Sequence, residues 1–291
     1  LQKWLTEAVE AAAGGKLSIS AVIRPEHWKK KGTLKTGAFE LDSVDASGPP
    51  ATVTINSTSL AFSNDLRQTK KSKAWKNYNL SGIASEIAAN GGMSCQYEAS
   101  TNPSYDRVEQ TRQSDIEFLR KLCQDAGISI KVTDGKLVLY DQAEYEAKAP
   151  VLTIEEGAKG GYIKYKLHSG SADTQYAKCR VRYLDPNTGK CIEGTAEDGD
   201  VSGDQCLEIK AKVGSVGEAQ ALAKKHLRLH NKLAKTATFT MPGDVGLVAG
   251  VTVQLKGFGG WDGKYIVTRA VHTVGSGGYT TQISIRKVLD Y

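Results

Sequence analysis

Residues 111–140 read TRQSDIEFLRKLCQDAGISIKVTDGKLVLY and carry the signals of a helix followed by a β-hairpin. Ser114 is a favourable helix N-cap, and Glu117 stands where its carboxylate can reach back to the backbone N–H of the cap. Apolar residues recur at helical spacing at Ile116, Leu119, Leu122 and Cys123, and this apolar stripe stops before Gly127. Because glycine adopts the left-handed conformation readily, Gly127 is expected to end this helix.

Two β-prone runs follow the helix, at residues 128–132 and 136–140. Asp134-Gly135 joins them, and this dipeptide favours the tight turn of a hairpin. An earlier helix is predicted over residues 80–90, where apolar residues form one stripe that Gly91-Gly92 ends. The sequence therefore predicts a small α/β domain over residues 79–145, and nothing in it resembles a catalytic constellation.

Strand patterns flank this domain on both sides. The expected strands lie at residues 16–23, 36–44, 51–57, 175–184, 191–194, 251–255, 265–271 and 279–285. A helix is expected over about 215–233, opened by a second capping box of Ser215 and Glu218. We predict an α+β protein that is mainly β, with a basic connector at 66–78 and a further linker at 141–150. Its two β domains cover 1–65, with a trimmed N-terminus, and 150–291.

Composition narrows the function classes. The chain has 291 residues, a formal charge of +6 and a pI near 8.9, a surplus too mild for a nucleic-acid-binding arm. No run of about 18 apolar residues is present, which predicts no membrane-spanning helix. The chain begins Leu1-Gln2-Lys3-Trp4, and we expect a trimmed N-terminus without a signal peptide.

The five cysteines contain no C-x-x-C pair, so we expect free thiols of a reducing compartment and no structural zinc site. Cys179 and Cys191 flank a predicted hairpin turn and could face each other across it.

The glycine-rich corner at residues 257–263, GFGGWDG, lacks the features of a dinucleotide-binding loop. Asp262 stands where the third glycine would be, and a strand follows instead of a helix. The sequence DPNTGK at 185–190 lacks the first glycine of a P-loop and the hydroxyl residue that follows its lysine. Both segments are predicted to be turns.

The remaining candidates for chemistry fail on spacing. His226 and His230 lie four residues apart but lack a third ligand and a general base. Glu155 and Glu156 are adjacent and would point to opposite faces of a strand. The acidic segment 197–204 lacks the order of a calcium loop and is expected to be a solvated hairpin tip.

The basic connector could contact phosphates beside Trp75, but a solvated linker or protein-contact strip fits its short length better. Its cations are Arg67, Lys70, Lys71, Lys73 and Lys76. We predict no catalytic residue, no cofactor and no metal, and hence a protein that is not an enzyme.

Three parts of the chain resemble the phage late control D family, the tail-hub proteins of contractile phage tails and related particles. The first is GAFELDSVDASGPP at 37–50. The second runs from KAW at 73–75 through YDRVEQ at 105–110 to residue 140, and the third comprises GVTV at 250–253, DGKYIV at 262–267 and GYTTQISIR at 278–286.

The resemblance implies two β-barrel-like domains around the α/β insert, and a homotrimeric ring that adapts a six-fold tail tube to a three-fold spike. Implied partners are the tail tube protein, a separate spike protein and other baseplate proteins, without specific nucleic-acid binding or membrane insertion. The implied location is the virion tail, assembled in the cytoplasm of a bacterial host. The alternatives are a tail-associated cell-wall hydrolase, which needs a catalytic carboxylate or Cys–His pair, and a carbohydrate-binding β module, which needs exposed aromatic platforms.

Overall fold

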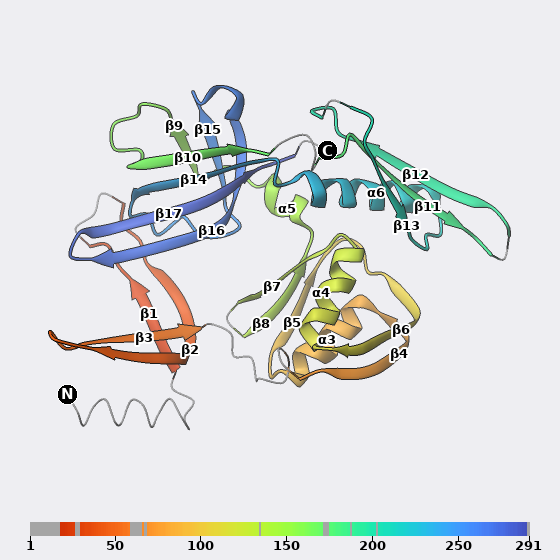
Figure 1. The fold of residues 1–291 in the computed structure, drawn as a ribbon, viewed down its shortest axis with the longest axis horizontal. Coiled ribbons are helices and arrows are strands. Elements are labelled where there is room, and N and C mark those ends of the chain that lie inside the picture. The colour runs from red at the N-terminus through yellow and green to blue at the C-terminus, as the bar shows by residue number, and fades with distance from the viewer. Residues whose placement is uncertain are drawn as a thin grey trace. The chain divides into compact units, whose positions relative to one another are not determined.

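The computed structural model describes residues 18–26, 30–58, 66, 69–133, 135–170, 175–186, 188–201 and 203–289. The chain divides into two compact units, Leu1–Asp141 and Gln142–Tyr291, shown in red to yellow-green and in green to blue (Figure 1). The described part is mainly β, with four helices and several separate sheets. None of the described helices combines the length and the apolar character needed to cross a membrane.

The first unit begins with an antiparallel sheet of order β1-β2-β3. Its strands are β1 (Ser18–Ile23), β2 (Leu34–Ser47) and β3 (Thr52–Thr58), which confirms the three strands expected in this region. Val44 pairs with Ile55, and Ala46 with Val53, so these apolar side chains share one face. On the other face the Asn56 side chain donates to Ser43 Oγ (2.9 Å) and to Asp45 Oδ2 (3.2 Å). The sheet is therefore amphipathic.

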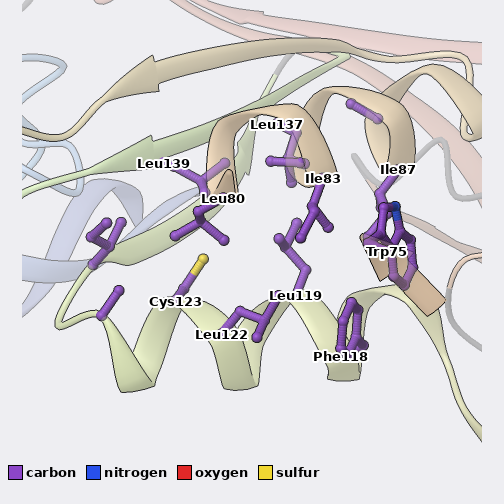
Figure 2. Close-up of a cluster of buried hydrophobic side chains, with 14 of the residues drawn as sticks. Trp75, Leu80, Ile83, Ile87, Phe118, Leu119, Leu122, Cys123, Leu137 and Leu139 are labelled. Atoms are coloured by element: carbon purple, nitrogen blue, oxygen red, sulfur yellow. The ribbon is translucent and has the colours of Figure 1, made fainter. Parts of the chain in front are cut away.

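The rest of the first unit is an α/β module. Its elements are β4 (Lys71–Asn79), α3 (Leu80–Asn90), β5 (Ser94–Glu98), β6 (Ser104–Gln113), α4 (Asp115–Asp125), β7 (Ser129–Thr133) and β8 (Lys136–Tyr140). The strands form two sheets, β4-β6 and β5-β8-β7. Figure 2 shows Leu80 of α3 pointing toward Cys123 of α4, and Ile83 toward Leu119, with Leu137 of β8 beside Ile83.

Both helices of the module lie where the sequence predicts them. The Ser114 backbone N–H donates to Glu117 Oε2 (3.1 Å), and the Glu117 N–H donates to Ser114 Oγ (3.3 Å), which confirms the capping box. Gly127 has φ of 65°, the left-handed conformation expected after the helix. Asp134 of the predicted turn, Arg67 of the connector and residues 1–17 lie outside the described residues.

The prediction of a connector at 66–78 is wrong for residues 71–78, which belong to β4, and the physical reason is the burial of Trp75. This residue is buried and stacks on Phe118 with ring centroids 5.0 Å apart. A single large aromatic surface outweighs the charged residues around it, and the segment pairs with β6 as β4. The predicted linker at 141–150 is likewise partly helical, because α5 occupies Gln142–Ala147.

The second unit contains a six-stranded sheet that curls into a half-barrel (Figure 1). Its order is β10-β14-β17-β16-β15-β9, with every neighbouring pair antiparallel except β15 and β9. The strands are β9 (Leu152–Glu155), β10 (Lys164–Ser169), β14 (Lys235–Pro242), β15 (Thr252–Lys256), β16 (Gly263–Gly275) and β17 (Gly278–Lys287). The expected architecture is thus observed in a coarser form, as one half-barrel sheet and several small sheets. The division into three domains stays a prediction.

A second sheet of this unit, of order β12-β11-β13, packs against α6 (Val216–Asn231). Its strands are β11 (Lys178–Leu184), β12 (Cys191–Glu197) and β13 (Cys206–Lys210). Gly194 allows the helix to approach closely, because a Cβ at this position would lie 2.3 Å from the backbone nitrogen of Gln220.

Two predictions in this region need correction. The Ser215 hydroxyl accepts from the Glu218 N–H (3.2 Å), but the Glu218 carboxylate accepts from the Gly214 N–H (2.7 Å), so only half of the capping box forms. Cys179 pairs with Ala196, whereas Cys191 pairs with Leu184 at the opposite end of the hairpin. The two thiols therefore cannot meet, and all five cysteines are free.

Candidate functional surfaces

The residues considered for chemistry lie apart from one another in the structure. His226 is buried in α6, while the His230 ring makes an edge contact with Tyr176 at 5.4 Å between centroids. Glu155 pairs with Lys256 (3.2 Å), and Glu156 accepts from the Tyr165 hydroxyl (3.4 Å). Within the described ranges, no three His, Cys, Asp or Glu residues are placed to hold a metal ion.

The glycine-rich corner is filled by its own aspartate. A short 3₁₀ turn, η2 (Gly259–Trp261), follows β15, and the Asp262 carboxylate accepts from the N–H groups of Gly257 (3.1 Å) and Phe258 (2.6 Å). A phosphate loop needs such backbone donors to face the ligand. Asp262, which spoils the sequence motif, already occupies them.

Two cations of the basic segment around Trp75 are paired with carboxylates. Lys71 pairs with Asp115 (2.8 Å), while Lys73 and the Trp75 indole N–H both contact the carboxylate of Glu86. Since the aromatic ring is buried, it offers no platform on which a base could stack. The structure therefore favours a structural strand over a nucleic-acid contact.

Four aromatic rings fill the open side of the half-barrel. Tyr165 of the edge strand β10 contacts Phe258, which follows β15, with ring centroids 5.3 Å apart. Phe239 and Tyr162 complete the cluster, at 5.5 Å and 6.2 Å from Phe258. Because the described parts of β9 and β10 are not paired, aromatic side chains close this side in place of backbone hydrogen bonds.

A buried ion cluster links three elements of the second unit. The Glu146 carboxylate in α5 pairs with Arg228 of α6 and with Arg286 of β17. Arg286 also donates to Gln142 Oε1 (2.9 Å). Burial first, and the positive charge of Arg286 second, lower the pKa of the nearby Lys232. Sequence reasoning missed this cluster because Glu146 and Arg286 lie 140 residues apart and share no local pattern.

The acidic segment 197–204 has a fixed base. Asp198 is buried and accepts from the Asn231 side chain (2.8 Å), which also donates to the Tyr176 carbonyl (2.8 Å). Asp200 and Asp204 beyond it are exposed, at 76% and 104% of their side-chain surface. The prediction of a solvated tip holds for these two residues. It is wrong for Asp198, whose buried carboxylate accepts a hydrogen bond from the side-chain amide of Asn231.

The sequence of the chain is similar to phage baseplate proteins. The phage tail baseplate hub (GPD) model matches residues 61–278. The probable baseplate hub protein of Escherichia phage P2 is 30% identical over 116 residues, which are 38% of this chain and 29% of that protein. The corresponding protein of Escherichia phage 186 is 20% identical over 299 residues, with 89% of this chain and 77% of that protein covered.

Solved structures share the fold. The 43 kDa tail protein of prophage MuSo2 from Shewanella oneidensis superposes with a TM-score of 0.66 at 15% identity, over 94% of this chain and 89% of that one. A chain of the Francisella PdpA–VgrG complex gives 0.53 at 9% identity, over 93% of this chain and 47% of that one. Since the family model matches well over half of the chain, this protein belongs to the phage tail baseplate hub (GPD) family.

Proposed function

We propose that the chain is a structural hub in the baseplate of a contractile phage tail or tail-like particle. The observation that carries the proposal is the family match over residues 61–278, which includes the α/β module and most of the second unit. The fold shared with tail proteins agrees with it. The hub family is a structural one and typically non-enzymatic, so we propose that this chain catalyses no reaction and needs no metal or cofactor.

In this proposal three copies form a closed ring that adapts a six-fold tail tube to a three-fold spike. Head-to-tail contacts between identical subunits close into rings when their rotation permits it. The partners are the tail tube protein, a separate spike protein and other baseplate proteins. The likeness to a chain of a VgrG-containing complex supports a spike-side partner. Assembly takes place in the cytoplasm of the bacterial host, before the tail is complete.

No specific observation favours either alternative function. A cell-wall hydrolase needs convergent catalytic groups, and Glu155, Glu156, His226 and His230 each have separate surroundings. A carbohydrate module needs exposed aromatic platforms, whereas Trp75 is buried and the rings of Phe239 and Phe258 pack within the half-barrel.

The decisive experiment measures mass in solution. Multi-angle light scattering on the full chain, alone and co-expressed with its proposed spike protein, should give three times 31.3 kDa for the hub component. A hub that remains monomeric in the presence of both spike and tube proteins would refute the ring. Peptidoglycan turnover that one point substitution abolishes would instead establish the hydrolase.

A further inference from the structure

The outer face of the six-stranded sheet carries a hollow of about 340 Å³. The hollow is lined by two rows of residues that pair directly across β10, β14 and β17. One row is Lys166–Thr238–Ser284, and the other is His168–Thr236–Arg286. All six residues line the hollow, together with Thr268 of β16 and Leu233 of the turn between α6 and β14, so most of its wall comes from adjacent paired strands.

The chemistry of the hollow suits an anion. None of the described residues that line it is Asp or Glu. Arg286 is already paired with Glu146, but no described carboxylate lies within ion-pair distance of Lys166. The hydroxyls of Thr236, Thr238 and Ser284 can each donate a hydrogen bond beside that ammonium group. A carboxylate entering here would meet a positive charge and several donors.

The same unit presents a matching acidic surface. Asp200 and Asp204 project from a segment whose base is fixed by the buried contact between Asp198 and Asn231. Their carboxylates are exposed in the ion pairs with Lys287 (3.5 Å) and Lys178 (3.8 Å), and pairs with such exposed members are weak in water. Both carboxylates are therefore available for a further contact at little cost.

We propose that the hollow of one copy receives the Asp200–Asp204 segment of the next copy. The occupant is thus a second copy of this chain, and the inference rests on the proposed ring. Because hollow and segment are different surfaces of one subunit, the contact is head-to-tail, the type that generates a closed ring. Complementary charge fixes the register of such a contact and disfavours wrong partners.

Charge reversal tests the pairing. Three variants of the full chain are made: K166E with H168E, D200K with D204K, and all four substitutions together. Assembly is measured by sedimentation velocity across protein concentration, with the spike protein present at a fixed ratio. Each pair alone should raise the concentration at which half the chains assemble by about tenfold or more, and the fourfold variant should return to within about threefold of the parent.

Lys164→Glu is the matched control. The substitution reverses the same charge on the same strand. Lys164 and Lys166 are two residues apart and therefore share a face of the sheet, but Lys164 does not line the hollow. The control substitution should leave the assembly midpoint unchanged. Circular dichroism melting curves establish that every variant is folded, and a variant that is unfolded is replaced by K166Q or D204N, which remove the charge without reversing it.

The outcomes separate this inference from the ring itself. If the parent forms trimers and both charge-reversed pairs form them equally well, the ring stands and the inference is overturned. If either pair disrupts assembly but the fourfold variant fails to recover, the two surfaces do not contact each other and the inference is again overturned. If the parent never assembles, even with both spike and tube proteins present, the proposed ring fails together with this contact.

Discussion

Replacing Glu146 by alanine should destabilise the second unit more than any exposed substitution in it. The Glu146 side chain is 4% exposed, and its partners Arg228 and Arg286 are 18% and 6% exposed. Removing the carboxylate leaves two largely buried guanidinium groups beside Lys232 without their counter-charge. Breaking a buried ion pair in this way typically costs about 3–5 kcal/mol.

Hydrogen exchange measured by mass spectrometry can locate this loss. Opening of α6 should become faster by more than about a hundredfold, which is what 3 kcal/mol represents at room temperature. Peptides from α4, in the first unit, should exchange as in the parent. Glu144→Ala on the same helix is the control, since this residue is exposed and should change little.

The loss should also depend on pH. The folded-state pKa of Lys232 already lies below its usual value, so the unfolded chain binds more protons and stability rises with pH as this lysine loses its charge. Glu146 opposes that pKa shift, and its removal should lower the pKa further. The E146A variant should therefore recover part of its stability as the pH rises toward 10.5. A variant with parental exchange rates in α6 at neutral pH would refute the reasoning.

Three other substitutions or treatments probe the remaining elements. Ser114→Ala with Glu117→Ala should destabilise the α/β module in urea unfolding, and loss of the N-cap alone typically costs about 0.5–2 kcal/mol. Because hydrogen bonds from Ser114 lower the pKa of Glu117, the stabilisation by the Glu117 carboxylate is present at neutral pH and is lost as the pH falls below 4.5. Equal stability of variant and parent at pH 7 would refute the capping assignment. Gly194→Val should disrupt the packing of α6 on β12 and cost about 1–3 kcal/mol, and an unchanged melting temperature would contradict the 2.3 Å clash. Maleimide labelling of the native chain should modify exposed Cys191 first and spare Cys123, whose pKa burial raises to about 12, until denaturant is added.

The local signals around α4 predict the helix correctly because the helix itself contains the groups that they satisfy. Ser114, Glu117 and Gly127 lie within one turn of the groups that they satisfy, so their pattern specifies α4 whatever surrounds it. The connector prediction failed because a distant partner decides the outcome. The sequence of Lys71–Asn79 is typical of a polar linker, but Trp75 is buried against Phe118. No residue near position 75 in the sequence indicates that partner.

The surfaces proposed to assemble the hub belong to this second class, because paired strands far apart in the sequence create them. Lys166 and Ser284 lie more than a hundred residues apart, yet both pair across Thr238 and so line one hollow. In the sequence Asp198 is part of an acidic run, but in the structure it is buried and accepts a hydrogen bond from Asn231. Asp200 and Asp204 follow it and are exposed. A structural protein needs surfaces placed in register and not a convergent set of reactive groups. Strand pairing provides that placement, and a motif along the chain does not record it.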